Sequence, residues 1–239
     1  MKKFFLTFAI LVLVALAAHR PEAAASEAAG RVEIFAGEAT MERAAGGRQK
    51  LETGDPVFAK DIIQTGPGGS AEIILADGSR TQLAADTALE VAVYQYDPGK
   101  KIRHALITLT SGKARFFVQD LEEFNDRRFR VQTETAVVAS LDTGFIVAFN
   151  PELPRDAICR KGLTNVVCLV NSVVVSSLSF QDKPTVLPAN MISQVCGANL
   201  PSPPRFVTPS ELAWIEAGLA TGTATADPNL SEPQGKLEN

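Results

Sequence analysis

The sequence is poor in the residue types that most often carry catalysis. Its 239 residues include only two histidines, three cysteines, two tyrosines and one tryptophan. His19 lies in an N-terminal region that we expect to be removed as a signal peptide. A Ser-His-Asp triad in the remaining chain would therefore depend on His104. No Gly-x-Ser-x-Gly motif occurs anywhere. This shortage argues against a histidine-based hydrolase.

The usual spacing of zinc and phosphate sites is missing as well. Cys159, Cys168 and Cys196 could join His104 in a Cys3His set, but none of their spacings matches a Cys-x2–4-Cys knuckle. The glycine-rich stretch GPGGS at residues 66–70 lacks the lysine and the following helix of a phosphate loop. We therefore predict no catalytic residue, no metal site and no cofactor.

Basic residues are slightly outnumbered, 23 against 27 acidic ones, for a net charge of −4. This balance disfavours nucleic acid, whose affinity rests on basic surface, and gives no electrostatic reason to bind anionic lipid. The one long apolar run, residues 4–18, follows two lysines and precedes small residues that fit cleavage between Ala25 and Ser26. Such cleavage removes three basic residues and one acidic residue, which takes the net charge to −6.

We therefore predict a signal peptide over residues 1–25 and a periplasmic or secreted protein, with no membrane insertion after cleavage. The run is shorter than the about 20 apolar residues that a membrane-spanning helix needs. An uncleaved segment that anchors the domain is the alternative.

Short alternating runs of apolar and polar residues fill the chain from about residue 30 to 200. They break near Ser111-Gly112, Glu134, Asp142 and Asn171. The pattern predicts an all-β, antiparallel-rich domain over residues 30–200, either a sandwich or a short barrel or solenoid-like meander. Structural turns are predicted at Gly54-Asp55, Gly66, Asp77-Gly78, Gly112 and Asn171.

The stretch ILADGSRTQLAADTALEV, residues 74–91, gathers polar groups that suit either a site or a turn. Asp77-Gly78 predicts a hairpin with a type I′ turn, after which strict alternation points Arg80 and Gln82 to solvent and Leu83 inward. Aspartates beside turn residues commonly bond their own backbone. Two carboxylates facing each other across a cleft would instead make a glycosidase. The candidates are Asp55, Asp61, Asp77, Asp86 and Asp97.

The cysteines predict a disulfide, because exported proteins usually pair them. The favoured pair is Cys159 with Cys168, across a hairpin that turns at residues 162–165. Cys196 would then be free, or it would replace one of the two as an alternative partner.

The C-terminal region changes character. Residues 201–207 form a proline-rich connector, and residues 208–219 predict a helix with Thr208 as N-cap and Glu211 completing a capping box. So short a helix needs to dock on the β-domain or on a partner. Residues 220–239 have few large apolar groups and predict a disordered tail.

The order of these turns resembles the FecR-type domain. The resemblance covers about residues 30–196, with LETGDPVFAKDIIQTGPGGSAEIILADGSRTQL, then LITLTSGKARFFV, FRVQTETAVVASLDTGFIV and CLVNSVVVSS. The family's Arg-Gly-Thr is replaced by Leu141-Asp142-Thr143, and the glycine of its late turn by Asn171. The resemblance implies an all-β periplasmic module without enzymatic chemistry. Ahead of the domain we expect only a signal peptide, and neither an anti-sigma segment nor a membrane helix, so we do not expect anti-sigma activity.

Three functions follow as expectations. The first is an exported, non-catalytic binding or scaffolding module whose partner is an envelope protein or a glycan. The second is a membrane-anchored component of a trans-envelope signalling system. The third is a glycan-active enzyme that uses paired carboxylates.

Overall fold

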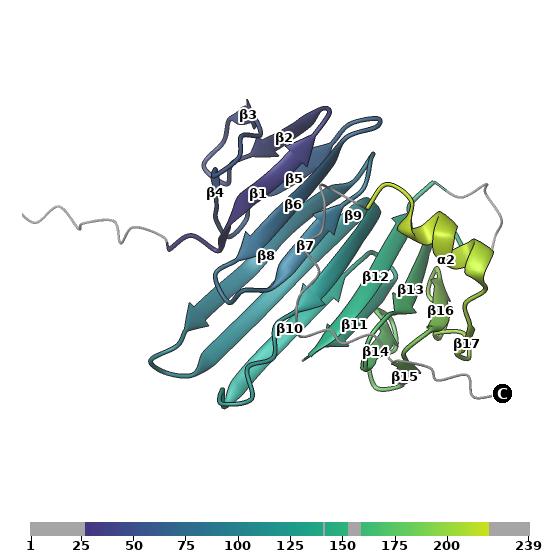
Figure 1. Ribbon diagram of the computed structural model, residues 1–239. Helices are drawn as coiled ribbons and strands as arrows, with labels where there is room; N and C mark the ends of the chain where they lie inside the picture. The colour runs from purple at the N-terminus through teal and green to yellow at the C-terminus, as the bar shows by residue number, and fades with distance from the viewer. Residues whose placement is uncertain (1–26, 141, 153–158, 220–239) are drawn as a thin grey trace, which may run out of the picture.

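The computed structural model describes residues 27–140, 142–152 and 159–219. The predicted signal peptide and the predicted tail therefore lie outside the described residues. The described part contains seventeen strands and one helix, as the all-β prediction requires (Figure 1). In this part, no helix is long and apolar enough to cross a membrane.

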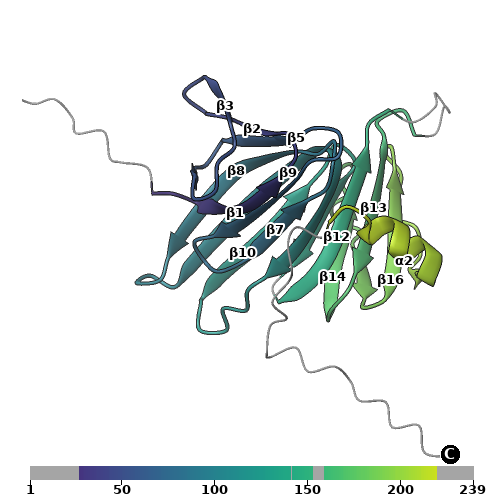
Figure 2. The same cartoon turned by 45° about the horizontal axis from the view of Figure 1, so that its top comes forward.

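The strands form two sheets that share one long strand (Figures 1 and 2). Sheet A has the order β4 (Pro56–Val57), β1 (Gly30–Ala36), β6 (Ser70–Leu75), β7 (Arg80–Leu83), β9 (Ile102–Val118), β12 (Thr143–Asn150), β13 (Leu163–Cys168), β16 (Met191–Cys196) and β17 (Arg205–Phe206). Sheet B has the order β3 (Arg48–Lys50), β2 (Ala39–Glu42), β5 (Ile62–Thr65), β8 (Ala88–Asp97), β9, β10 (Asp126–Gln132), β11 (Ala136–Ser140), β14 (Ser172–Ser177) and β15 (Thr185–Pro188). All these pairings are antiparallel except β9 with β10.

The shared strand β9 corrects one detail of the sequence prediction. Instead of two strands around Ser111-Gly112, the chain runs through without a break from Ile102 to Val118. Its first part pairs with β8 and β10 in sheet B, and its second part, from Gly112, pairs with β7 and β12 in sheet A. Gly112 has φ +84°, a conformation that glycine adopts without strain. The glycine thus lets the strand pass from one sheet to the other.

The core lies between the two sheets, because alternate side chains of each sheet point toward the other. The Phe116 ring of sheet A lies 6.3 Å from the Phe129 ring of sheet B and 5.2 Å from the Phe145 ring. All three side chains are fully buried. The predicted all-β fold is therefore confirmed, as are the breaks near Glu134 and Asn171, which separate β10 from β11 and β13 from β14.

Helix α2 (Pro209–Glu216) covers part of the outer face of sheet A (Figure 2). Thr208 caps it, and Glu211 completes the capping box. Ile215 and Leu219 are buried, and they pack against a group of outward-facing residues of the sheet. That group is Ala84, Ile146, Val167 and Ile192. The helix therefore docks on the β-domain, and the preceding proline-rich segment contributes the short strand β17.

Candidate binding surface

The polar cluster at residues 74–91 forms a buried network centred on Asp77. Its carboxylate accepts hydrogen bonds from Arg103 Nη1 at 2.8 Å, Ser79 N at 3.0 Å and Ser79 Oγ at 2.9 Å. Both Asp77 and Arg103 have fully buried side chains. Arg103 also donates to the carbonyl of Arg127 at 2.9 Å. The Tyr94 hydroxyl accepts from Asp77 N at 2.9 Å, and burial, followed by the nearby Asp77 charge, raises the pKa of Tyr94. Such a saturated carboxylate holds the fold together and is not open to a substrate.

The hairpin around Asp77 differs from the predicted type I′ turn. Gly78 has φ +86°, whereas Asp77 is not among the described residues of positive φ. Leu75 N donates to Ser79 O at 2.8 Å and Gly78 N to Leu75 O at 3.0 Å. These bonds define a three-residue loop in which a turn is followed by a left-handed glycine. The type I′ prediction is therefore wrong, because the Asp77 side chain bonds forward to Ser79.

The alternation after this hairpin is only partly as predicted. Arg80 is exposed and Leu83 is buried. Gln82 lies on the outer face, but it is 8% exposed and donates to Glu72 Oε2 at 3.0 Å. The prediction that Gln82 faces solvent is therefore wrong. Its polar group takes part in a cross-strand contact with β6.

Three of the other candidate aspartates have separate partners. Asp61 is buried and accepts from Arg43 Nη1 at 2.7 Å, while Asp55 accepts from Glu52 N at 2.9 Å. Asp97 accepts from Lys100, whose hydrogen bonds lower the pKa of that carboxyl. Asp86 is exposed. Within the described residues, no group of three or more histidines, cysteines or acids is placed to hold a metal ion.

The remaining predicted turn positions differ in backbone conformation. Gly54 (φ +88°), Gly112 and Asn171 (φ +57°) occupy the left-handed region, and the Asn171 side chain donates to the Asp142 carbonyl at 2.9 Å. Gly66 is not among the described residues of positive φ; its N–H donates to Glu38 O at 2.8 Å.

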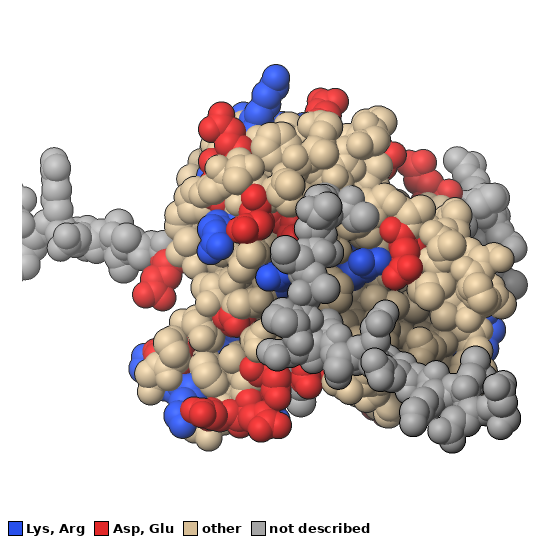
Figure 3. All heavy atoms as spheres, in the orientation of Figure 1, with Lys and Arg blue, Asp and Glu red and all other residues tan. Residues whose placement is uncertain are grey.

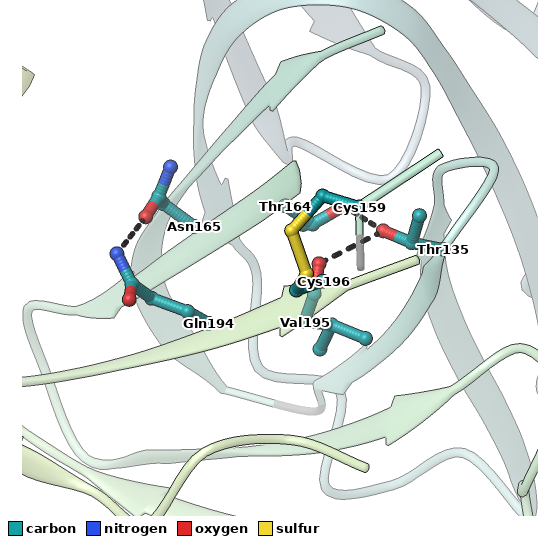
Figure 4. The surroundings of a disulfide bond; sticks show 7 residues. All are labelled: Thr135, Cys159, Thr164, Asn165, Gln194, Val195 and Cys196. Atoms are coloured by element: carbon teal, nitrogen blue, oxygen red, sulfur yellow. Dashed lines mark hydrogen bonds between the residues drawn. A yellow bond between two sulfur atoms is a disulfide. The ribbon is translucent and has the colours of Figure 1, made fainter. Parts of the chain in front are cut away.

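The disulfide joins Cys159 to Cys196, with their Cα atoms 4.9 Å apart (Figure 4). The favoured prediction, Cys159 with Cys168, is wrong for a reason of register. Strand β13 pairs with β16 so that Leu163 faces Cys196 and Cys168 faces Met191. Cys168 therefore lies about 17 Å further along the strand. It is a free, buried thiol, and burial raises its pKa to about 11.

His104 lies at the surface of strand β9. Its Nε2 is 2.6 Å from Asp126 Oδ2, and Arg128 also bonds that carboxylate. The hydrogen bond from Arg128, then that from His104, lowers the pKa of Asp126. Since Cys159 and Cys196 are bonded to each other and His104 contacts Asp126, three members of the considered Cys3His set are engaged elsewhere.

Charges of both signs are mixed on the face shown in Figure 3. At the ends of β8, β9 and β10 they form three ion pairs with nitrogen-to-oxygen distances of 2.8, 3.9 and 3.2 Å. These pairs are Lys100 with Asp97, Lys101 with Glu123, and Arg127 with Asp120.

The outer face of sheet A is polar on one side and apolar on the other. One row of cross-strand neighbours runs through Glu72, Gln82, Arg115, Ile146, Val167 and Ile192. Helix α2 covers the three apolar members. At the boundary, Arg115 Nη2 pairs with Glu216 of the helix at 3.0 Å. The row thus sets where the helix docks.

Lys113 fixes the C-terminal end of this helix. Its Nζ donates to the Trp214 carbonyl at 3.1 Å and to the Ala217 carbonyl at 2.8 Å. A cation suits this position because the last carbonyls of a helix carry partial negative charge. Burial, followed by the charge of Arg115, lowers the pKa of Lys113. The same Nζ lies 5.4 Å from the centre of the Trp214 ring.

The C-terminal segment on sheet A, which comprises β17 and helix α2, also exposes two aromatic rings. Phe206 is 73% exposed and Trp214 is 68% exposed, more than the other large hydrophobic residues of the described part. Trp214 is the single tryptophan of the chain. Because aromatic side chains are enriched where proteins bind partners, this segment is the candidate binding surface.

Comparison with known protein families matches the middle part of the chain. The family model described as "FecR protein" matches residues 61–163, which run from the start of β5 to the start of β13. The fold defines an all-β module whose buried aspartates Asp61 and Asp77 are paired with arginines. Within that class, residues 61–163 match the FecR family model, so the FecR resemblance is confirmed over this segment. No curated protein sequence matches this chain.

Two solved structures are similar to part of this chain. Both are crystal structures of a "putative anti-sigma factor" from Parabacteroides distasonis ATCC 8503, one at 1.65 Å and one at 2.50 Å resolution. Each is 22% identical to this chain, with TM-scores of 0.47 and 0.48. The matches cover 65% of this chain and 65% and 64% of the two structures, so the chain spans about two thirds of their length.

Proposed function

We propose that this chain is an exported, non-catalytic FecR-family module that binds a protein or a glycan of the cell envelope. The C-terminal segment on sheet A is the contact surface. The observation that carries the proposal is Trp214, a large aromatic side chain exposed on a helix that the domain holds in place.

The way the helix is held supports this proposal. Thr208 and Glu211 cap its first turn, Lys113 bonds its last carbonyls, and Arg205 pairs with Glu211 at 2.6 Å. These contacts order the helix before a partner arrives. A pre-ordered aromatic side chain costs less conformational entropy on binding than a flexible one.

The carboxylates of the predicted cluster support a non-catalytic role. Asp77 and Asp61, which are buried, are paired with Arg103 and Arg43. A glycosidase needs two carboxyl groups that flank one bond of the substrate. Among the described residues, four of the five candidate aspartates bond different partners at separate turns, and only Asp86 does not, an arrangement that favours binding over hydrolysis.

Export rests on the predicted signal peptide, and the anchored signalling component stays the alternative. The two differ in the fate of residues 4–18. N-terminal sequencing of the mature protein separates them: a start near Ser26 supports an exported module, and a retained N-terminus supports the anchor.

The binding role is tested by affinity capture from the envelope fraction. The full-length protein is expected to retain a reproducible protein or glycan, and Trp214→Ala is expected to lose it. Val186→Ala is the matched control, because Val186 is 59% exposed on strand β15 of the other sheet. Equal capture by wild type and Trp214→Ala, or capture of nothing specific, would contradict the proposal.

A further inference from the structure

A groove runs beside helix α2 on the outer face of sheet A. Its floor is the row of cross-strand neighbours Lys113, Ala148 and Asn165, next to the row that the helix covers. Trp214 lines one side of this groove, and Asn150 and Asp86 line it as well. The cavity measures ≈ 630 Å³, within the range of sites for small ligands.

The two asparagines of the groove have fixed amide groups. Asn165 Oδ1 accepts from Gln194 Nε2 at 2.7 Å (Figure 4), and Asn150 Oδ1 accepts from Glu152 N at 2.9 Å. Each oxygen is thereby engaged, and each Nδ2 has no partner within the described residues. An amide nitrogen carries two donors. The groove therefore presents amide donors whose orientation is already set by the protein.

The charged residues of the groove indicate the charge of the ligand that it can bind. The ammonium group of Lys113 is directed at the carbonyls of the helix end. Asp86 is exposed, and its carboxylate has no partner within the described residues. This carboxylate accepts hydrogen bonds and repels anions. Within the described lining, the groove thus combines amide donors, the acidic residues Asp86 and Glu152 and an aromatic ring. Its one cation among the described residues, Lys113, is directed away from a ligand and at the helix end.

We propose that this groove binds a neutral oligosaccharide, with one sugar ring stacked on Trp214. The apolar C–H face of a sugar packs on an aromatic ring, whose large area contributes most of the contact. Sugar hydroxyls both donate and accept, so they suit the Asn150 and Asn165 amides together with Asp86. The inference rests on the proposed binding function and names its ligand class.

The single tryptophan makes a direct test available, because its emission reports on this groove alone. The protein is titrated with maltotetraose, cellotetraose and tetra-N-acetylchitotetraose, and with tetragalacturonate as the anionic probe. We expect a saturable change in Trp214 emission with at least one neutral oligosaccharide. The account is overturned if none changes the emission up to roughly 10 mM, or if the anionic probe binds more tightly than all neutral ones.

Variants locate the binding. Asn150→Ala and Asn165→Ala are each expected to weaken it about fivefold or more. Asn199→Ala, an exposed asparagine outside the groove, is the matched control and should bind as wild type does. Asn150 lies at the end of β12, so its variant keeps the test valid if Asn165→Ala fails to fold. Unchanged affinity in both groove variants contradicts the site.

A failure of the saccharide inference can be distinguished from a failure of the proposed binding function. If affinity capture returns a Trp214-dependent protein while no sugar changes the emission, the binding function stands and the saccharide inference is wrong.

Discussion

The Asp77 carboxylate lies 2.8 Å from the Arg103 guanidinium, and both side chains are completely buried. The pair joins the β6–β7 hairpin of sheet A to the sheet B part of β9. Ser79 extends it, since its hydroxyl donates to Asp77 and accepts from Gln119 N at 3.0 Å. The polar cluster at residues 74–91 therefore links the two sheets and forms a structural tie between them.

Removing one member of this pair should be costly. Asp77→Ala is expected to lower the free energy of unfolding by about 3–5 kcal/mol, because it leaves the Arg103 charge buried without its partner. Urea unfolding followed by circular dichroism measures the loss. The double variant Asp77→Ala with Arg103→Met should recover part of it. An effect below about 0.5 kcal/mol, the usual size for a surface substitution, would show that the pair is not a structural tie.

Gly112 lies in strand β9, which joins the two sheets, and Gly54 serves as its control in a test of how this strand packs. Both have similar positive φ, +84° and +88°. A Cβ at Gly112 would collide with Thr87 and with the Asp86 carbonyl, whereas a Cβ at Gly54 would meet nothing within 4 Å. Gly54→Ala should cost about 1–2 kcal/mol for its backbone. Gly112→Ala should cost about 1–3 kcal/mol more. Equal thermal stability of the two variants would contradict this packing of β9.

The disulfide account predicts which thiols react. Without reductant, intact-mass analysis after alkylation should find no modified thiol in the native protein and one, at Cys168, after unfolding. The native Cys168 is protected by burial and by a thiol pKa raised to about 11.

Single substitutions separate the possible pairs. Cys168→Ala should leave no free thiol after unfolding, and Cys196→Ala should leave two. Loss of the bond in Cys196→Ala should also lower stability by about 2–4 kcal/mol. A free-thiol count of zero for unfolded Cys196→Ala would indicate the Cys159–Cys168 pair instead.

The attachment of helix α2 should weaken in acid. Hydrogen bonds from Arg205, then those from Thr208, lower the pKa of Glu211 from 4.5 to about 2. Because the folded pKa is the lower one, this stabilisation is fully present above about pH 4.5 and is lost as the pH falls through about 2.

Trp214 emission, followed from about pH 5 to about pH 2, should report that loosening before global unfolding. Glu211→Gln lacks the titrating carboxyl, so its emission should lose this step. Identical profiles for wild type and Glu211→Gln would contradict the assignment.

Local patterns predicted much of this structure. The alternation of apolar residues gave the strands of the sandwich, and Thr208-x-x-Glu211 gave the helix start, because both depend on neighbours in the chain. Arg103 was missed, although it shares the two-residue period of the buried Ala105, Ile107 and Leu109. The Cys159–Cys196 bond depends on the pairing of β13 with β16, which local spacing does not encode. The groove likewise depends on where α2 docks.

The central claim is that partners contact the C-terminal segment on sheet A. In-cell photo-crosslinking tests it most directly, with a benzophenone amino acid at position 214 and, as control, at position 93. Val93 is 49% exposed on strand β8 of sheet B. The account predicts a specific adduct from position 214 and none from position 93. Adducts from position 93 alone, or identical adducts from both positions, would contradict it.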